Sequence, residues 1–223
     1  MWTLLRLTIQ LHNITIHIMR FNLTLLTTAA LMMCLTACKK NDQKEPIPET
    51  PGMVNINGKD YKTVKIGSQT WTSESYAGNG GMAYGPTAKP EYGKYYTYNE
   101  VKAIALPTGW RLPSMDDYKT MGQANGIIFT PGVQNTEAAK KLISKTGWKN
   151  AAGTNTSGLN LFPGNMIYNG QPTPDGDVSE FWTDNGNTFS IMEAGTNSNL
   201  LNVQFFTNSS MPEYRFPVRF VKD

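Results

Sequence analysis

The chain has 223 residues, enough for one domain of ordinary size. Arg6 and Arg20 are the only Lys or Arg residues before residue 39. From residue 39 onward the chain has 18 basic and 17 acidic side chains, so this part is nearly neutral and its charge does not indicate a nucleic-acid partner. No histidine or cysteine follows residue 38, which excludes most nucleophile–base pairs and most zinc or copper sites; we therefore expect no enzyme.

The amino-terminal region predicts a lipoprotein signal. Residues 23–35 form an apolar run of signal-peptide length, and Arg20 precedes it as a positive flank. The run ends in Leu-Thr-Ala-Cys38, which resembles the lipobox of bacterial lipoproteins. The resemblance implies that Cys38 is lipidated and becomes the first mature residue. The alternative is a free core cysteine in a helix, and the charged stretch directly after Cys38 argues against it.

The segments around this signal have separate interpretations. Residues 1–18 are too polar for a clean membrane span, and we hypothesise that translation starts at Met19, which makes 19–37 the signal peptide. Residues 38–52 are charged and proline-rich, so we interpret them as the lipidated cysteine and a flexible tether. The expected location is the outer membrane, with the lipid as anchor and the membrane face left open.

A hairpin opens the domain. Residues 53–58 and 61–66 alternate apolar and polar side chains, and Asn57-Gly58 is the strongest short hairpin signal between them. A further strand is expected at 70–72. The Gly- and Pro-rich residues 77–93 predict an irregular loop, and a short helix is expected at 99–105 before Pro107.

Two more helices follow. Ser114 and Asp117 have the spacing of a capping box, which predicts a helix over 114–123. Thr136 is expected to cap a helix over 137–145, whose lysine-rich side we interpret as solvated.

After Trp148 the chain predicts strands and loops. The expected strands are 159–162, 181–183, 188–193, 200–206 and 216–221. With the helices before them, they indicate an α+β fold: short helices packed on a small antiparallel sheet with long loops.

Seven blocks in order carry a family resemblance. They include Pro107-Thr-Gly-Trp-Arg-Leu-Pro113, Phe181-Trp-Thr183 and Pro217-Val-Arg-Phe-Val-Lys-Asp223. This pattern resembles the Fibrobacter succinogenes major paralogous domain of Bacteroidetes and Fibrobacteres surface proteins, and covers residues 53–223. The resemblance implies a C-type lectin-like fold, in which the terminal strands come together.

One departure from that family concerns two positions. Members often carry cysteines where this chain has Leu106 and Phe220. The joint loss implies that the two cysteines pair in the family. We predict that Leu106 and Phe220 touch and that their apolar contact replaces the bond.

Oxygen ligands and aromatic loops supply the candidate sites. Asp175, Asp177 and Glu180 are a possible Ca²⁺ site, with an ordinary turn as the alternative. Tyr84 and Tyr168 lie in Gly- and Asn-rich loops and are candidates for stacking on a sugar ring, against ordinary loop packing. The ligand-binding prediction joins these tyrosines with Asp175 and Asp177.

These observations lead to two functional hypotheses. The first is a non-catalytic cell-envelope lipoprotein that binds a glycan or an envelope protein through its C-type lectin-like domain. The alternative is a structural or accessory component of a surface assembly with no small-molecule ligand.

Overall fold

The computed structural model describes residues 52–85, 87, 89–207 and 211–223. The predictions for the start at Met19, the signal peptide, Cys38 and nearly all of the tether lie outside the described residues. No helix in the described part has the length and apolar character needed to cross a bilayer.

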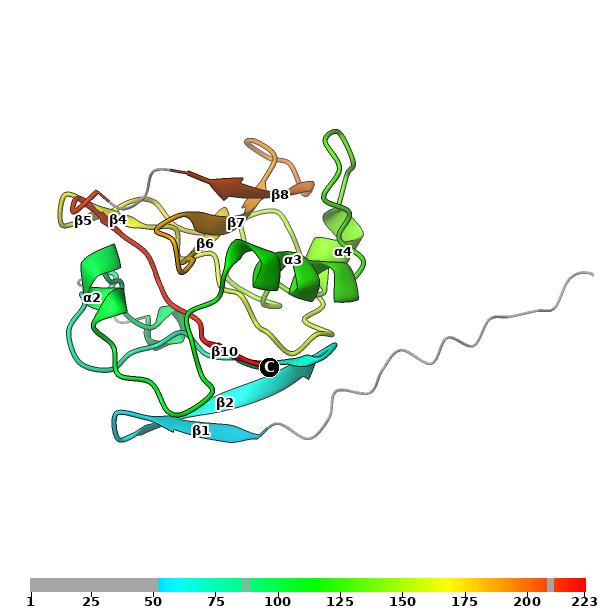
Figure 1. Cartoon of the computed structure of the whole chain (residues 1–223). Helices are drawn as coiled ribbons and strands as arrows, with labels where there is room; N and C mark the ends of the chain where they lie inside the picture. The colour runs from blue at the N-terminus through cyan, green and yellow to red at the C-terminus, as the bar shows by residue number, and fades with distance from the viewer. Residues whose placement is uncertain (1–51, 86, 88, 208–210) are drawn as a thin grey trace, which may run out of the picture. The chain divides into compact units, whose positions relative to one another are not determined.

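The first sheet joins both ends of the domain (Figure 1). Its order is β1 (Met53–Ile56), β2 (Lys59–Ile66), β3 (Gln69–Thr72) and β10 (Val221–Lys222), and all its pairs are antiparallel. The predicted hairpin turn is confirmed, because Asn57 and Gly58 have φ of 52° and 82°, as a tight hairpin turn requires.

Two further antiparallel sheets come from the second half of the chain. One has the order β6 (Val178–Trp182), β7 (Thr188–Glu193) and β8 (Leu201–Phe206). The other has the order β5 (Gln171–Pro172), β4 (Ile167–Tyr168) and β9 (Tyr214–Arg215), which the sequence did not predict. Strands of two residues carry too little alternation to be detected.

The helices are short: the 3₁₀ turn η1 (Pro90–Tyr92), then α2 (Tyr98–Lys102), α3 (Met115–Ala124) and α4 (Thr136–Lys140). The capping box at Ser114 and Asp117 is confirmed, and a second one joins Thr97 to Glu100. Local hydrogen bonding between a cap and the first turn therefore decides where α2 and α3 begin.

The prediction for α4 is wrong at both ends. Its N-cap is Asn135, because the Thr136 hydroxyl accepts the backbone N–H of Leu201 at 3.0 Å instead of capping the helix. The helix stops at Lys140 rather than Lys145. Ile143 then forms a parallel bridge with Leu161, so the chain is extended where a helical stripe was expected.

Two strand predictions are also corrected. Of residues 159–162, only Leu161 forms a bridge, the one with Ile143. Of 216–221, only the end forms β10, since Pro217 lacks an N–H and the segment bonds to several neighbours rather than to one strand. The expected apolar alternation survives, because Phe216, Val218 and Phe220 are all buried.

The main core joins the β6-β7-β8 sheet and helices α3 and α4 to side chains of the first sheet. In it, Tyr118 stacks on Phe189 with ring centroids 4.5 Å apart and lies 5.1 Å from the ring centroid of Trp71. A second cluster contains Trp182 and Phe220, and Leu106 packs against it. Direct contact between Leu106 and Phe220 stays a prediction. The coarse fold is confirmed as antiparallel sheets with few short helices, and the C-type lectin-like assignment stays a prediction.

Candidate functional site

Tyr84 and Asp175, two of the expected ligand-binding residues, belong to one cluster with Lys89 and Tyr92. The Lys89 ammonium pairs with Asp175 and lies 5.5 Å and 5.0 Å from the ring centroids of Tyr84 and Tyr92. The Tyr92 hydroxyl donates to Asp175 at 2.7 Å, and the Tyr84 hydroxyl donates to the backbone oxygen of Thr173. We call these four residues the tyrosine–lysine cluster.

The charged groups of the tyrosine–lysine cluster are paired within the cluster by an ion pair and hydrogen bonds. Partial burial raises the pKa of Asp175, but hydrogen bonds from Lys89 and Tyr92 outweigh it and hold the pKa below its usual value. Burial, with the nearby Asp175 charge, raises the pKa of Tyr84 to about 12. Tyr84 also packs against the rings of Tyr92 and Tyr95, so its ring is part of the packing rather than an open platform.

The other two members of the calcium hypothesis lie in different environments. Asp177 pairs with the Lys149 ammonium at 2.7 Å on the surface. Glu180 is buried on β6 and accepts a hydrogen bond from the Thr188 hydroxyl. Within the described ranges, no three acidic, histidine or cysteine side chains form a group that could hold a metal ion, so the structure does not assemble these carboxylates into a site.

Tyr168 stands apart from the cluster. It lies on β4, its side chain is 44% exposed, and its ring centroid is 5.1 Å from that of Tyr214. No hydrogen bond or ring contact links it to Tyr84 or Asp175 among the described residues. Direct contacts therefore join Tyr84 and Asp175 into one cluster, and a ligand site that also includes Tyr168 and Asp177 stays a prediction.

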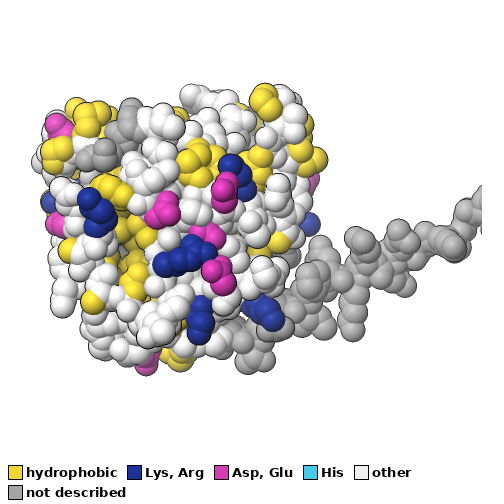
Figure 2. Space-filling model, in the orientation of Figure 1, with side chains coloured by type: hydrophobic (Ala, Val, Ile, Leu, Met, Phe, Trp, Pro, Cys, Tyr) yellow, Lys and Arg dark blue, Asp and Glu magenta, His cyan; other side chains and the backbone are white. Residues whose placement is uncertain are grey.

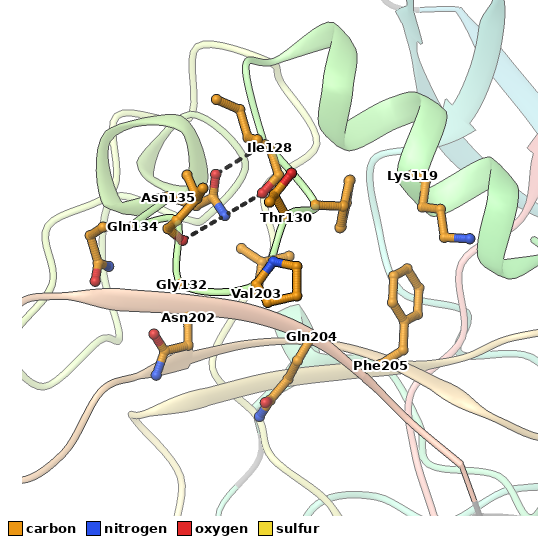
Figure 3. Close-up of a pocket in the computed structure, with 13 residues that line it drawn as sticks. Lys119, Ile128, Thr130, Gly132, Gln134, Asn135, Asn202, Val203, Gln204 and Phe205 are labelled. Atoms are coloured by element: carbon orange, nitrogen blue, oxygen red, sulfur yellow. Dashed lines mark hydrogen bonds between the residues drawn. The ribbon is translucent and has the colours of Figure 1, made fainter.

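The described part of the chain contains a groove that the sequence did not predict. It has a volume of about 480 Å³ and lies between the loop that joins α3 to α4 and the strand β8 (Figure 3). We call it the β8 groove. Its lining comprises Lys119, residues 128–135 and residues 202–205.

The loop side of the β8 groove is held in shape from within. The Asn135 side chain accepts the backbone N–H of Ile128 at 2.8 Å and donates to the backbone oxygen of Ile128 at 3.0 Å (Figure 3). Phe129 packs against Phe205 of β8, with ring centroids 5.9 Å apart. Ile128 and Val133 are 54% and 40% exposed, so this side offers apolar surface to a ligand.

Leu201 directly precedes the β8 residues that line the groove, and side chains from the loop region hydrogen-bond to its backbone groups. Gln134 Nε2 donates to the Leu201 oxygen at 2.9 Å, and the Leu201 N–H donates to the Thr136 hydroxyl at 3.0 Å. Both backbone groups of Leu201 therefore point away from β7.

The groove is close to electrically neutral. Lys119 is its only charged lining residue, and its ammonium pairs with Asp116 at 2.8 Å and lies 6.0 Å from the Phe205 ring centroid. Basic and acidic side chains also alternate over the face in Figure 2, with no continuous band of either sign. The groove lining therefore consists mainly of neutral hydrogen-bonding groups and apolar side chains.

The candidate residues predicted from the sequence do not include the loop side of this groove. One signal was present. Ile127, Ile128 and Phe129 are three apolar residues in a row, followed by the turn residues Pro131 and Gly132. An apolar run outside a regular element indicates a loop that packs or binds.

Comparison with known proteins identifies the family of the chain. The family model described as the Fibrobacter succinogenes major domain matches residues 56–222. Neither the curated proteins nor the solved structures contain a match.

Proposed function

The chain belongs to the Fibrobacter succinogenes major domain family, and we propose that it is a non-catalytic cell-envelope lipoprotein that binds a glycan or protein ligand in the β8 groove. The groove carries this proposal. Its volume lies in the range of ligand sites, and it combines apolar surface with neutral hydrogen-bonding groups. Its lining has no carboxylate, histidine or cysteine to act as an acid, base or nucleophile, which favours binding over catalysis.

The lipoprotein part rests on the sequence around Cys38. A tether that enters at β1 fits the placement of the groove, because β1 and β8 lie at opposite edges of the domain in Figure 1. The C-type lectin-like part is supported by β1 and β10, which share one sheet as that fold requires.

The alternative is a structural component of a surface assembly. It is favoured by apolar side chains that are exposed outside the groove, such as Met53, Met82, Tyr168 and Met211. Isolated exposed apolar residues are common on soluble proteins, so this observation carries less weight than a formed groove.

Binding is tested with the full-length protein, purified in detergent and applied to a glycan array and to a phage-displayed library of random heptapeptides. Val133→Glu places an unpaired carboxylate in the groove, and Met211→Glu is the matched control, since Met211 is 46% exposed and lies outside it. We expect binding that Val133→Glu abolishes and Met211→Glu preserves. No binding to either collection, or equal loss in both variants, would refute a ligand site in the groove.

Anchoring is tested separately in cells. Cys38→Ala is expected to stop incorporation of labelled palmitate and to release the protein from the membrane fraction. Protease shaving of intact cells then distinguishes the surface from the periplasmic face. Palmitate labelling that persists in Cys38→Ala would contradict the lipobox interpretation.

A further inference from the structure

The β8 groove follows the edge of a strand rather than one face of a sheet. Four consecutive residues of β8, 202–205, line it. Neighbouring residues of a strand point to opposite faces, so one face could expose only two of the four. β8 is also the last strand in the order β6-β7-β8, which leaves its outer edge without a strand.

The hydrogen-bond pattern shows which residues face outward. The Ala194 N–H donates to the Leu200 oxygen at 2.9 Å, whereas both backbone groups of Leu201 bond to Gln134 and Thr136. Antiparallel pairs alternate between bonded and non-bonded positions. Asn202 and Gln204, opposite Met192 and Ser190, therefore bond to β7, while Val203 and Phe205 direct their N–H and C=O groups outward.

These outward groups are open to a ligand. In the described chain no hydrogen bond joins the outward backbone groups of Val203 or Phe205 to another group. At Leu201 the same kind of edge is capped by a carboxamide and a hydroxyl, which act in place of a peptide group. The open part of the β8 edge therefore begins directly after Leu201, whose backbone groups bond to side chains of the same chain.

We propose that an extended segment of another polypeptide binds the β8 groove and adds as a fourth strand along Val203 to Phe205. This inference rests on the proposed function, since it names the class of ligand for the same groove. Strand addition uses backbone hydrogen bonds for affinity and side-chain contacts for specificity. Evenly spaced donors and acceptors along an extended edge match a polypeptide backbone better than the varied hydroxyl geometry of a sugar.

The charges of the groove lining indicate which residue types the bound segment would carry. Lys119 is already paired with Asp116, so a charged residue of the partner would find no free counter-ion in the groove lining. The exposed side chains of Ile128 and Val133 favour apolar contact. We therefore infer an uncharged segment with apolar residues toward the loop and no proline at the positions that pair with Val203 and Phe205.

The test starts from the displayed heptapeptides selected on the full-length protein in detergent. The best peptide is synthesised, and amide hydrogen exchange is measured with and without it. Strand addition predicts that exchange slows at least tenfold at Val203 and Phe205. Asn202 and Gln204 are the internal controls, because their amides already bond to β7 and should not change.

Two variants at one position supply a second readout. Val203→Pro removes the outward N–H and is expected to weaken the peptide about tenfold, the effect of losing roughly 1.4 kcal/mol. Val203→Ala keeps the N–H and should bind within about threefold of the wild type. If Val203→Pro does not fold, the exchange pattern and Val133→Glu still decide the question.

Each contrary result has its own meaning. Peptide binding without slowed exchange at Val203 and Phe205 would overturn strand addition. Oligosaccharide binding that Val133→Glu abolishes, with no peptide selected, would also overturn it but leave the proposed function intact. Slowed exchange in the protein alone, together with a dimer in ultracentrifugation, would identify a second copy of the chain as the occupant and overturn a separate partner. Absence of any groove ligand would refute both proposals.

Discussion

Arg111 and Asp117 form an ion pair across the turn that leads into α3, and Arg111 Nη2 lies 2.9 Å from Asp117 Oδ1. The same carboxylate accepts the Ser114 N–H at 2.7 Å and the Gln69 side-chain amide at 2.6 Å. One buried carboxylate thus joins the start of α3 to β3 of the first sheet. The network connects a local cap to a partner 48 residues away.

We predict that Asp117→Asn lowers the free energy of unfolding by about 2 kcal/mol, because charge-assisted hydrogen bonds are replaced by weaker neutral ones. Chemical denaturation at neutral pH measures this. The control is Asp116→Asn, whose side chain is 87% exposed and should change stability little. Equal losses in the two variants would contradict the role of the network.

The same residue has a pH signature. Burial raises the pKa of Asp117, but hydrogen bonds from Arg111 and Ser114 outweigh it and lower the pKa from 3.8 to about 2. The stabilisation is complete above about pH 5, and it is lost progressively as the pH falls through 3.8 and then below 2, because the unfolded state takes up the proton first. We expect Asp117→Asn to remove this part of the acid-induced loss. An unchanged acid-unfolding profile in Asp117→Asn would contradict the assignment.

Glu180 has the opposite behaviour. Its burial raises the pKa from 4.5 to about 7. The folded protein then keeps a proton that the unfolded chain releases, so stability falls as pH rises from about 4.5 to 7. Glu180→Gln should flatten this decline, which amounts to no more than about 3 kcal/mol. Urea unfolding at pH 5 and pH 8 provides the measurement, and parallel pH slopes in both proteins would show that Glu180 does not titrate in this way.

Arg219 is buried, and among the described residues it has no acidic hydrogen-bond partner. Its guanidinium donates to the backbone oxygens of Thr72 and Asn160 at 3.0 Å and 3.1 Å. Arg219→Lys should cost about 2–3 kcal/mol, since one ammonium cannot span both oxygens and leaves one of them unpaired. Arg215→Lys, at the more exposed pair with Glu100, is the comparison and should cost less than about 1 kcal/mol in thermal unfolding. A reversed order would show that burial of Arg219 is not the deciding factor.

The predicted contact between Leu106 and Phe220 is tested by changing both residues to cysteine. A disulfide should form in the double variant, and it should stabilise the oxidised form over the reduced form by up to about 4.7 kcal/mol. Unfolding with and without dithiothreitol measures the difference, with the two single variants as controls. Failure to form an intramolecular disulfide under oxidising conditions would place the residues too far apart.

Local features were predictable from short stretches of sequence. The hairpin at Asn57-Gly58 and the cap at Ser114 depend on residues within one turn of each other, and both were predicted correctly. Thr136 was predicted as a cap for the same local reason, but its hydroxyl serves Leu201, which is 65 residues away. A local pattern fails where a distant backbone group competes for the same oxygen.

The candidate site residues show the same difference between what a local pattern predicts and what distant contacts decide. Tyr84 and Asp175 were selected separately from loop composition, and the structure joins them through Lys89 into a packed cluster. Tyr168 has the exposure expected of a ligand contact, but among the described residues its ring contact is with Tyr214 and not with this cluster. Composition identifies residue types that suit a ligand, but it carries no information on which of them meet.

By itself, the sequence determined the family, the antiparallel character of the domain, the absence of histidine and cysteine beyond residue 38, and the boundaries set by caps and turns. These depend on composition or on neighbouring residues. Only the tertiary structure decided the β8 groove, because its two sides are about 70 residues apart in the chain. The outward direction of Val203 and Phe205 depends on how β8 pairs with β7, a choice that no single segment contains.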